Sequence, residues 1–200
     1  MTLSIYFVTP DGVEDAMVAA ALRGGATLVQ LRDKTARDAD MIAQARRLKR
    51  MLAPFGVPLI VNDRLDVALT ADADGLHIGQ SDGDPEAMRR ALGPDRLLGL
   101  SIENEGQLAH VPDCVDYLGV GPLRDTHIKP DAAPALGLEA LGRIVRAAPL
   151  PSVAIGAVGL GDVPRLKALG CAGIAVVSAI SEAPDPEAAT RALADSWRSA

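Results

Sequence analysis

The chain has 200 residues, of which 48% are hydrophobic and 23% charged, a balance typical of one globular domain with a substantial core. Only 2% are aromatic, so the core must be built mainly from Ala, Val, Leu and Ile. The net charge of −6 argues against an extended nucleic-acid or membrane surface. It does not exclude a small anionic ligand held by a few local cations.

The sequence carries no targeting signal that we recognise. MTLSIYFVTP at the start lacks a positively charged region, and no apolar run approaches the roughly 18 residues of a membrane span. Cys114 and Cys171 lie far apart and outside any metal-binding or redox spacing, which predicts two reduced core thiols. We therefore expect a cytoplasmic protein.

Short apolar runs alternate with longer amphipathic ones along the whole chain. The runs predicted to be strands cover residues 5–8, 27–31, 58–61, 75–78, 97–100, 117–120, 152–155 and 173–177. The predicted helices cover residues 13–22, 38–52, 63–70, 85–92, 104–110, 138–147, 162–169 and 186–197. Pro85 and Pro186 stand at helix starts, where proline is tolerated, and Gly24 and Gly170 stand at helix ends.

Eight strand–helix units with continuously apolar strands predict a parallel sheet covered on both faces. We expect an α/β fold, a single-domain (β/α)₈ TIM barrel spanning residues 1–200. The alternative is an open doubly wound sheet. The number of units and the lack of a GxGxxG turn after the first strand favour the barrel.

In such a barrel the site lies where the strands end, and charged residues follow the second strand at once. Arg32 and Lys34 stand two apart on an extended chain, so both side chains face the same way. A guanidinium fork and an ammonium group both suit phosphate. The competing interpretation is a pair of surface salt bridges, for instance with Asp33.

Carboxylates follow the third and fourth strands. Because neighbouring strands are about 4.8 Å apart, Asp63 and Asp82 are both within reach of one ion. Magnesium is often held by one or two carboxylates, water and substrate phosphates. Asp63 as a helix N-cap, or Asp82 as a turn or cap before Pro85, are the structural alternatives.

The loop at 121–137 is long for a strand–helix connection and contains Pro122, Pro130 and Pro134. It is either a lid that excludes water or a mobile insertion. Thr126 and Lys129 are its best candidates for facing a ligand.

The stretches AIGAVG (154–159) and VVSAI (176–180) follow the last two strands, where barrels often bind phosphate through backbone N–H groups. Gly156 paired with Ser178 supports this, whereas close helix–strand packing is the alternative. His77, inside a strand, is interpreted as a hydrogen-bonded core or rim residue and not as a base.

Taken together, these motifs resemble the thiamine-phosphate synthase family. QLRDK, VNDR, ADGLHIGQSD, GLS, DYLGVGP, the Thr-x-x-Lys of THIK, AIG and VVSAI occur in that family's order, from about Tyr6 to Ile180. The resemblance implies a (β/α)₈ barrel that joins a hydroxymethylpyrimidine, supplied as its diphosphate, to a thiazole phosphate. Thiamine phosphate and diphosphate would be the products, and Mg²⁺ the cofactor.

The resemblance also implies roles for individual residues. Arg32, Lys34 and Lys129 would act on the leaving diphosphate, and Asp63 and Asp82 would bind the metal. The pyrimidine diphosphate would be held by Gln30, Leu31, Arg32, Asp33, Lys34, Asn62, Ser101 and Lys129. The thiazole phosphate would be held by Thr126, His127, Ile128, Gly156, Ala157, Val177 and Ser178. Small molecules are thus the expected partners, without nucleic acid or membrane; a homo-oligomer is left open.

Three positions depart from the family pattern. Ile128 stands where a hydroxyl residue is usual, Ala157 where a second glycine is frequent, and Ile102-Glu103 where Thr-His often follows the serine. A lost hydroxyl contact would weaken acceptor binding by about 1 kcal/mol. If Ala157 must adopt a positive φ, strain of roughly 1–2 kcal/mol follows.

Two other functions compete with the synthase. A related barrel is a metal-free thiazole tautomerase, but that family has a histidine where this chain has Pro122 and does not keep the pyrimidine-diphosphate residues together. A catalytically silent paralogue that only binds a thiamine precursor is the third hypothesis.

The departure at position 128 yields a prediction. Ile128→Thr restores the usual hydroxyl, so we expect a several-fold lower KM for the thiazole phosphate in steady-state kinetics. A higher or unchanged KM would show that the missing hydroxyl is compensated elsewhere.

Overall fold

The computed structural model describes residues 2–126 and 133–200 and shows a closed barrel of eight parallel strands. The strands are β1 (Ile5–Val8), β2 (Leu28–Leu31), β3 (Leu59–Asn62), β4 (Gly75–Ile78), β5 (Leu97–Ile102), β6 (Tyr117–Val120), β7 (Ser152–Ala154) and β8 (Gly173–Val176). Each strand pairs in parallel with the next, and β8 returns to β1, where Ile5 lies opposite Ile174. The predicted (β/α)₈ fold is therefore confirmed.

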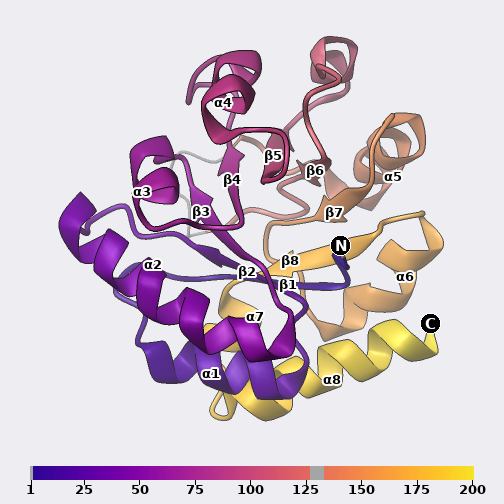
Figure 1. Cartoon of the computed structure of the whole chain (residues 1–200). Coiled ribbons are helices and arrows are strands. Elements are labelled where there is room, and N and C mark those ends of the chain that lie inside the picture. Colours follow the sequence, from indigo (N-terminus) through magenta and orange to yellow (C-terminus); the bar gives the residue numbers. More distant parts are fainter. Residues whose placement is uncertain (1, 127–132) are drawn as a thin grey trace.

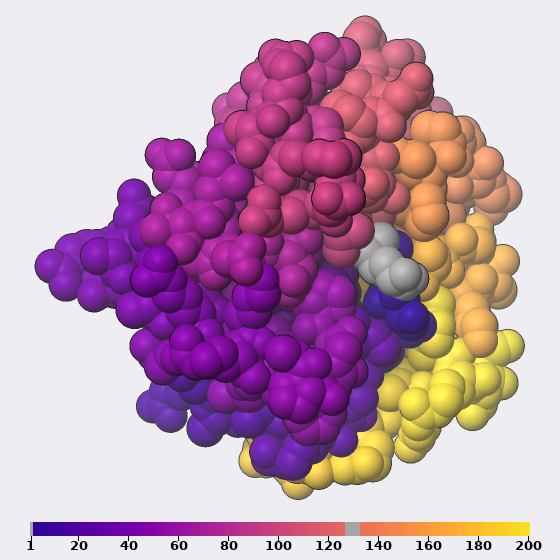
Figure 2. Space-filling view, viewed as in Figure 1, coloured from indigo at the N-terminus to yellow at the C-terminus, as the bar shows by residue number. Residues whose placement is uncertain are grey.

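Helices surround the barrel in chain order (Figure 1). The α-helices are α1 (Asp15–Gly24), α2 (Asp38–Leu52), α3 (Leu65–Thr70), α4 (Pro85–Leu92), α5 (Gly137–Ala147), α6 (Val163–Ala168), α7 (Ser178–Ser181) and α8 (Pro186–Ser199). Three 3₁₀ helices add to them, η1 (Ala53–Phe55), η2 (Glu105–His110) and η3 (Leu160–Asp162). The space-filling view shows the chain's colours following one another around the ring, so that the last segments lie against the first (Figure 2). None of the described helices combines the length and apolarity needed to cross a bilayer.

Several predicted boundaries are corrected by local backbone conformation. The helix expected over 63–70 begins at Leu65, because Asp63 adopts a left-handed φ of 58° that cannot start a helix. The first helix ends at Gly24, as expected, and Gly25, at φ 108°, is its left-handed C-cap. The helix expected over 104–110 is a 3₁₀ helix, capped by Asn104.

The short helix α7 was not predicted. Its four residues begin one residue after the end of β8, in a stretch that the sequence pattern predicts to be a strand–helix connection. A single turn has too few residues to show a helical period, so the sequence pattern does not reveal it.

Residues alternate between two hydrophobic layers. On β1, Ile5 and Phe7 pack outward against the helices, while Tyr6 and Val8 face the barrel interior. The interior cluster is small and includes Leu3, Tyr117 and Val153. Side chains therefore fill the barrel towards its amino end, and the space at the other end is left for a site.

The closing seam between β1 and β8 requires a residue without a side chain. A Cβ atom at Gly173 would lie 1.8 Å from the backbone oxygen of Leu3, so the two strands approach only because position 173 is glycine. Ile174 N–H then donates to the backbone oxygen of Ser4 at 3.0 Å. Barrel closure thus depends on this position.

We predict that Gly173→Ala destabilises the fold by about 3 kcal/mol, because backbone cannot yield to the new methyl group. In thermal unfolding this corresponds to a fall of roughly 6–12 °C in Tm. Gly161→Ala is the matched control, since a Cβ there meets nothing within 4 Å. Equal Tm values for the two variants would contradict this account of the seam.

Candidate active site

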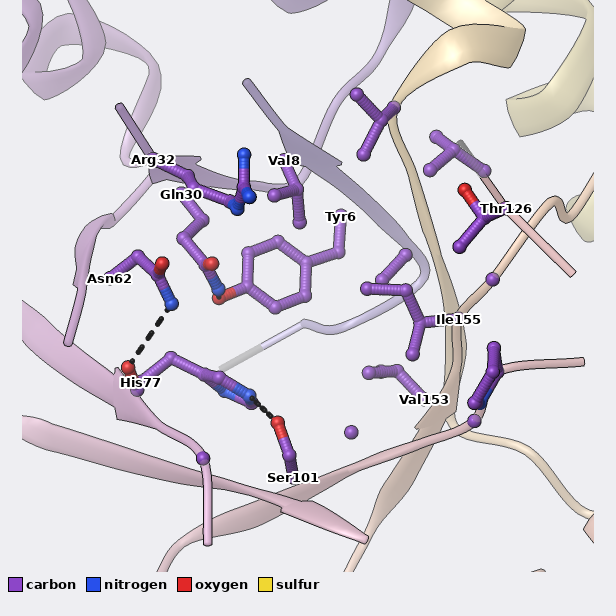
Figure 3. A pocket seen from close by; sticks show the side chains of 18 of the residues that line it. Tyr6, Val8, Gln30, Arg32, Asn62, His77, Ser101, Thr126, Val153 and Ile155 are labelled. Carbon is purple, nitrogen blue, oxygen red and sulfur yellow. Dashed lines mark hydrogen bonds between the residues drawn. The ribbon is translucent and has the colours of Figure 1, made fainter. Parts of the chain in front are cut away.

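One cavity of about 430 Å³ opens where the strands end. Its volume suits a small organic molecule. Its lining comes from all eight strands or the segments that follow them, including Tyr6, Gln30, Asn62, His77, Ser101, Gly119, Val153 and Ala175. Figure 3 shows Arg32, Gln30 and Asn62 on one side of the cavity and Thr126 and Ile155 on the opposite side.

Both predicted cations of the second segment line this cavity. Arg32 is almost fully buried and donates from Nη1 to Asp11 Oδ1 at 3.1 Å. Lys34 is half exposed, and its ammonium group forms an ion pair with Asp63. The predicted same-side orientation is therefore found. The alternative interpretation, a pair of salt bridges, is confirmed in part. The ion pairs form at the cavity, with Asp11 and Asp63, and not with Asp33.

Two residues of the same segment do not line the cavity with their side chains. Leu31 is buried in the layer between barrel and helices, because it alternates with Gln30. Asp33 is turned into its own loop, where it accepts hydrogen bonds from Gly12 N–H (2.9 Å) and from the backbone and hydroxyl of Thr35 (2.9 and 2.8 Å). Ala36 N–H adds a fourth bond, at 2.8 Å. Neither Leu31 nor Asp33 lines the cavity, and their predicted roles in substrate binding stay predictions.

Asp33 instead shapes the loop that carries the cations. Burial disfavours its charged form, but the donors around it more than compensate and hold the pKa of its carboxyl below the usual value. Arg64 supports the same loop by donating to the backbone oxygens of Asp33 (3.0 Å) and Ala36 (2.7 Å). The side chain between the two cations thus fixes the backbone on which they stand.

Asp63 and Asp82 lie side by side in the cavity wall. Burial, together with the neighbouring Asp82 carboxylate, raises the pKa of Asp63 despite its ion pair with Lys34. Asp82 also accepts from Gly79 N–H at 2.6 Å, which fixes the turn after β4. The capping alternatives do not hold: Asp84 caps α4, and Asp63 makes no cap to α3.

Asn62 and Ser101 complete this side of the site. Asn62 Nδ2 lies 3.5 Å from the backbone oxygen of His77, and Ser101 Oγ lies 3.0 Å from His77 Nε2 (Figure 3). Gln80 donates to the backbone oxygen of Ser101 at 2.6 Å. Two predicted polar contacts are therefore held in place by β4 and the turn that follows it.

The opposite side is built from the last two strand ends. Gly156, Ala157, Val177 and Ser178 line the cavity beside Thr126. Gly156 has φ 97°, and a Cβ there would lie 2.4 Å from Pro122 Cβ. No other residue type fits this position without displacing the loop.

An ion pair braces this side from behind. Arg124 bonds Asp162 through both terminal nitrogens, at 2.8 and 2.5 Å, and also donates to the backbone oxygen of Ala157 at 3.1 Å. The Arg124 guanidinium holds the pKa of the Asp162 carboxyl below its usual range. The loops after β6 and β7 are thus linked beside the cavity.

Three predicted residues, His127, Ile128 and Lys129, lie outside the described residues, and their roles stay predictions.

The geometry above was compared with known proteins. The sequence model of a family described as thiamine monophosphate synthase matches residues 5–180. This chain belongs to the thiamine monophosphate synthase family. A thiamine-phosphate synthase of Roseiflexus sp. (strain RS-1) is 49% identical over 178 residues, covering 88% of this chain and 75% of that protein.

Two further relatives extend the likeness over nearly the whole chain. A thiamine-phosphate synthase of Xanthobacter autotrophicus is 48% identical over 197 residues, covering 96% of this chain and 93% of that protein. The solved structure of a thiamine phosphate pyrophosphorylase from Pyrococcus furiosus superposes with a TM-score of 0.90 at 32% identity, covering 98% and 96% of the two chains.

The departures from the pattern of the thiamine monophosphate synthase family fall differently on the site. Ile102 is fully buried in the outer layer, away from the cavity, whereas Glu103 lines it. Ala157 lines the cavity and adopts φ 49°, the conformation in which an L side chain is strained. We expected backbone strain here if Ala157 had a positive φ, and the structure shows this positive φ.

Sequence reasoning did not assign Tyr6, His77 and Tyr117 to the site of this family member, although Tyr6 and His77 line the cavity. His77 was correctly expected to be hydrogen-bonded. The signal that was available is the pair of glycines, Gly99 and Gly119, at the neighbouring strands: a Cβ on Gly99 would lie 2.4 Å from His77 Nδ1. A glycine facing the barrel interior indicates that a large side chain from a neighbouring strand occupies the space beside it.

We predict that Ala157→Gly stabilises the protein by about 0.5–1 kcal/mol, because relief of left-handed strain exceeds the added freedom of the unfolded chain. Denaturant unfolding would measure it. The control is Ala53→Gly, at φ −53°, which should lose about 0.5–1 kcal/mol. A loss of stability in both variants would show that position 157 is not strained.

Proposed function

We propose that this chain makes thiamine phosphate by transferring a hydroxymethylpyrimidine group from its diphosphate to a thiazole phosphate, with Mg²⁺ held at Asp63 and Asp82. As a member of the thiamine monophosphate synthase family it is a transferase that acts on small molecules. The observation that carries the detailed proposal is the shared cavity of Arg32, Lys34, Asp63 and Asp82. Two cations and two carboxylates together match a metal-bound diphosphate better than either charge type alone.

The two carboxylates fit a magnesium ion in their chemistry. Both are oxygen donors, and burial together with their proximity raises the pKa of Asp63, which marks a place where a cation is favourable. Among the described residues there is no cluster of three or more metal-ligating side chains, so the remaining ligands would be water and diphosphate oxygens. Magnesium bound there would neutralise charge on the leaving diphosphate.

The chain's own residues perform the remaining work in this proposal. Arg32 holds one end of the diphosphate, and its bond to Asp11 keeps its guanidinium at the cavity. Lys34 exchanges Asp63 for a diphosphate oxygen when substrate binds. Both charges are in place before the carbon–oxygen bond breaks, which lowers the cost of separating charge.

No covalent nucleophile is needed. The amino group of the pyrimidine supplies electron density to its methylene carbon as diphosphate leaves, and the thiazole nitrogen then forms the new carbon–nitrogen bond. The apolar wall of Val8, Val153 and Ile155 excludes water, which would otherwise capture the carbon. Thr126, Gly156 and Ser178, on the opposite side, would hold the thiazole phosphate.

We also infer a cytoplasmic location for this activity. Cys114 and Cys171 are both unpaired, as expected of a reducing compartment. Burial raises the pKa of Cys171 to about 11, so its thiol is unreactive at neutral pH.

The test supplies both precursors with Mg²⁺ and follows diphosphate release and thiamine phosphate together. We predict that Asp63→Ala and Asp82→Ala each lower kcat/KM by at least about 100-fold, with partial recovery at high Mg²⁺. Asp66→Ala, an exposed carboxylate on α3 next to Asp63, is the matched control and should keep full activity.

Unchanged rates in both cavity variants would place the metal elsewhere. Metal-free isomerisation of a thiazole without diphosphate release would replace the synthase by a tautomerase, and binding without turnover would indicate a silent paralogue.

A further inference from the structure

A chain of four hydrogen bonds crosses the barrel interior and joins two opposite residues of the cavity floor. Gln30 Nε2 lies 2.6 Å from Tyr6 Oη, and Tyr6 Oη lies 2.8 Å from Tyr117 Oη. Tyr117 Oη lies 3.0 Å from His77 Nδ1, and His77 Nε2 lies 3.0 Å from Ser101 Oγ. Both ends, Gln30 and Ser101, line the cavity, and Figure 3 shows them with Tyr6 and His77 between them.

The middle of this chain is sealed from solvent. Tyr6, Tyr117 and His77 are buried, and burial raises the pKa of both tyrosines well above 10, so their hydroxyls stay protonated. Buried hydroxyl groups need partners, since an unmade hydrogen bond is costly there. The hydrogen bonds of this row are therefore constrained together.

The fold makes room for this row. A Cβ on Gly99 of β5 would lie 2.2 Å from Tyr117 Cζ, and one on Gly119 of β6 would lie 3.1 Å from His77 Cε1. These strands present no side chain where the tyrosine and histidine rings meet. The row is a built element of the barrel interior and not a chance contact.

Each hydroxyl has one proton to donate, which gives the row a direction. The Gln30 amide donates to Tyr6, so Tyr6 donates to Tyr117, and Tyr117 donates to His77 Nδ1. A neutral imidazole that accepts at Nδ1 carries its proton on Nε2 and donates to Ser101 Oγ. If the bonds ran in the opposite direction, Tyr6 would have to donate to Gln30. The Gln30 NH₂ group cannot accept, so the side-chain amide of Gln30 would have to rotate by about 180°.

The direction of the row fixes what its two ends offer the cavity. The side-chain amide oxygen of Gln30, Oε1, takes no hydrogen bond from the described residues and is left as an acceptor. The Ser101 hydroxyl, having accepted from His77, is left as a donor. An aminopyrimidine matches the Gln30 end, because its amino group donates to the amide oxygen, and its ring nitrogens accept. The corresponding oxo compound places a carbonyl oxygen, which also accepts, against the amide oxygen of Gln30, and is bound only if that amide turns over.

We propose that the hydrogen-bonded row from Gln30 to Ser101 sets the donor–acceptor polarity of the pyrimidine subsite and makes the enzyme select an amino over an oxo substituent. This inference rests on the proposed function. Tyr6, Tyr117 and His77 are positioning residues, because they act through the two end residues. Accepting the oxo compound requires every group in the row to reverse together, so discrimination is a property of the whole row.

The first experiment compares Kd for the aminopyrimidine diphosphate and its oxo analogue in the absence of the thiazole phosphate, because the amino group also takes part in the chemical step. The wild type should prefer the amino compound by about 100-fold or more. Tyr117→Phe removes the acceptor for the Tyr6 hydroxyl, so Tyr6 can donate to a turned Gln30 amide and the preference should fall by about tenfold. Thr190→Val is the control: its buried hydroxyl donates to Pro186 O at 2.7 Å, far along the chain in α8 and outside the cavity. It should lose stability but keep the preference.

A second measurement needs no turnover. In protein labelled with ¹⁵N-histidine, the nitrogen shifts of His77 should report a neutral ring protonated on Nε2, with His77→Gln identifying its signals among the three histidines. A ring protonated on Nδ1, or on both nitrogens, would overturn the inference. So would equal amino-to-oxo preferences in wild type and Tyr117→Phe. Lack of turnover of the amino compound by the wild type would instead refute the proposed function and leave the histidine shifts to decide this one.

Discussion

The site is organised by the close approach of two carboxylates, Asp63 and Asp82, in the cavity where the barrel strands end. Like charges brought together under partial burial need a cation, and the free chain supplies one in Lys34. A bound metal ion would take the place of Lys34 beside the two carboxylates. The oxygens of the diphosphate would then accept hydrogen bonds from Lys34 and Arg32. In the proposed complex, the bound metal ion and diphosphate complete this charge pattern.

The barrel places this charge pattern by strand alternation and by left-handed backbone. Gln30 and Arg32 face inward because Leu31 and Asp33 do not, and Asp33 anchors the loop so that Lys34 stays near Asp63. Asp63 itself occupies a left-handed conformation, tied by its N–H to the backbone oxygen of His77 at 2.9 Å. Strain of this kind is found where function requires a side chain in one place. The carboxylate proposed to bind the metal, at the end of β3, is thus held by the neighbouring strand β4, which carries the histidine of the interior row.

Much of this was predictable from sequence because each inference needed only local rules. Continuous apolar runs indicated parallel strands, and two-residue spacing put Arg32 and Lys34 on one side. What failed needed long-range information. Whether position 33 faces substrate or its own loop depends on Gly12, twenty-one residues away. From the sequence alone, His77 is interpreted as a core residue. Only the fold shows that Gly99 on β5 and Gly119 on β6 leave space beside its ring. The left-handed conformation at Asp63 is held by its bond to His77 on the neighbouring strand, which no local pattern encodes.

The central claim is that Asp63, Asp82, Arg32 and Lys34 bind one metal–diphosphate unit. Calorimetric titration of the protein with inorganic diphosphate, with and without Mg²⁺, tests it most directly. The account predicts that Mg²⁺ strengthens diphosphate binding at least tenfold and that this gain disappears in Asp82→Ala. Diphosphate affinity that is independent of Mg²⁺, or a gain that survives the loss of Asp82, would contradict it.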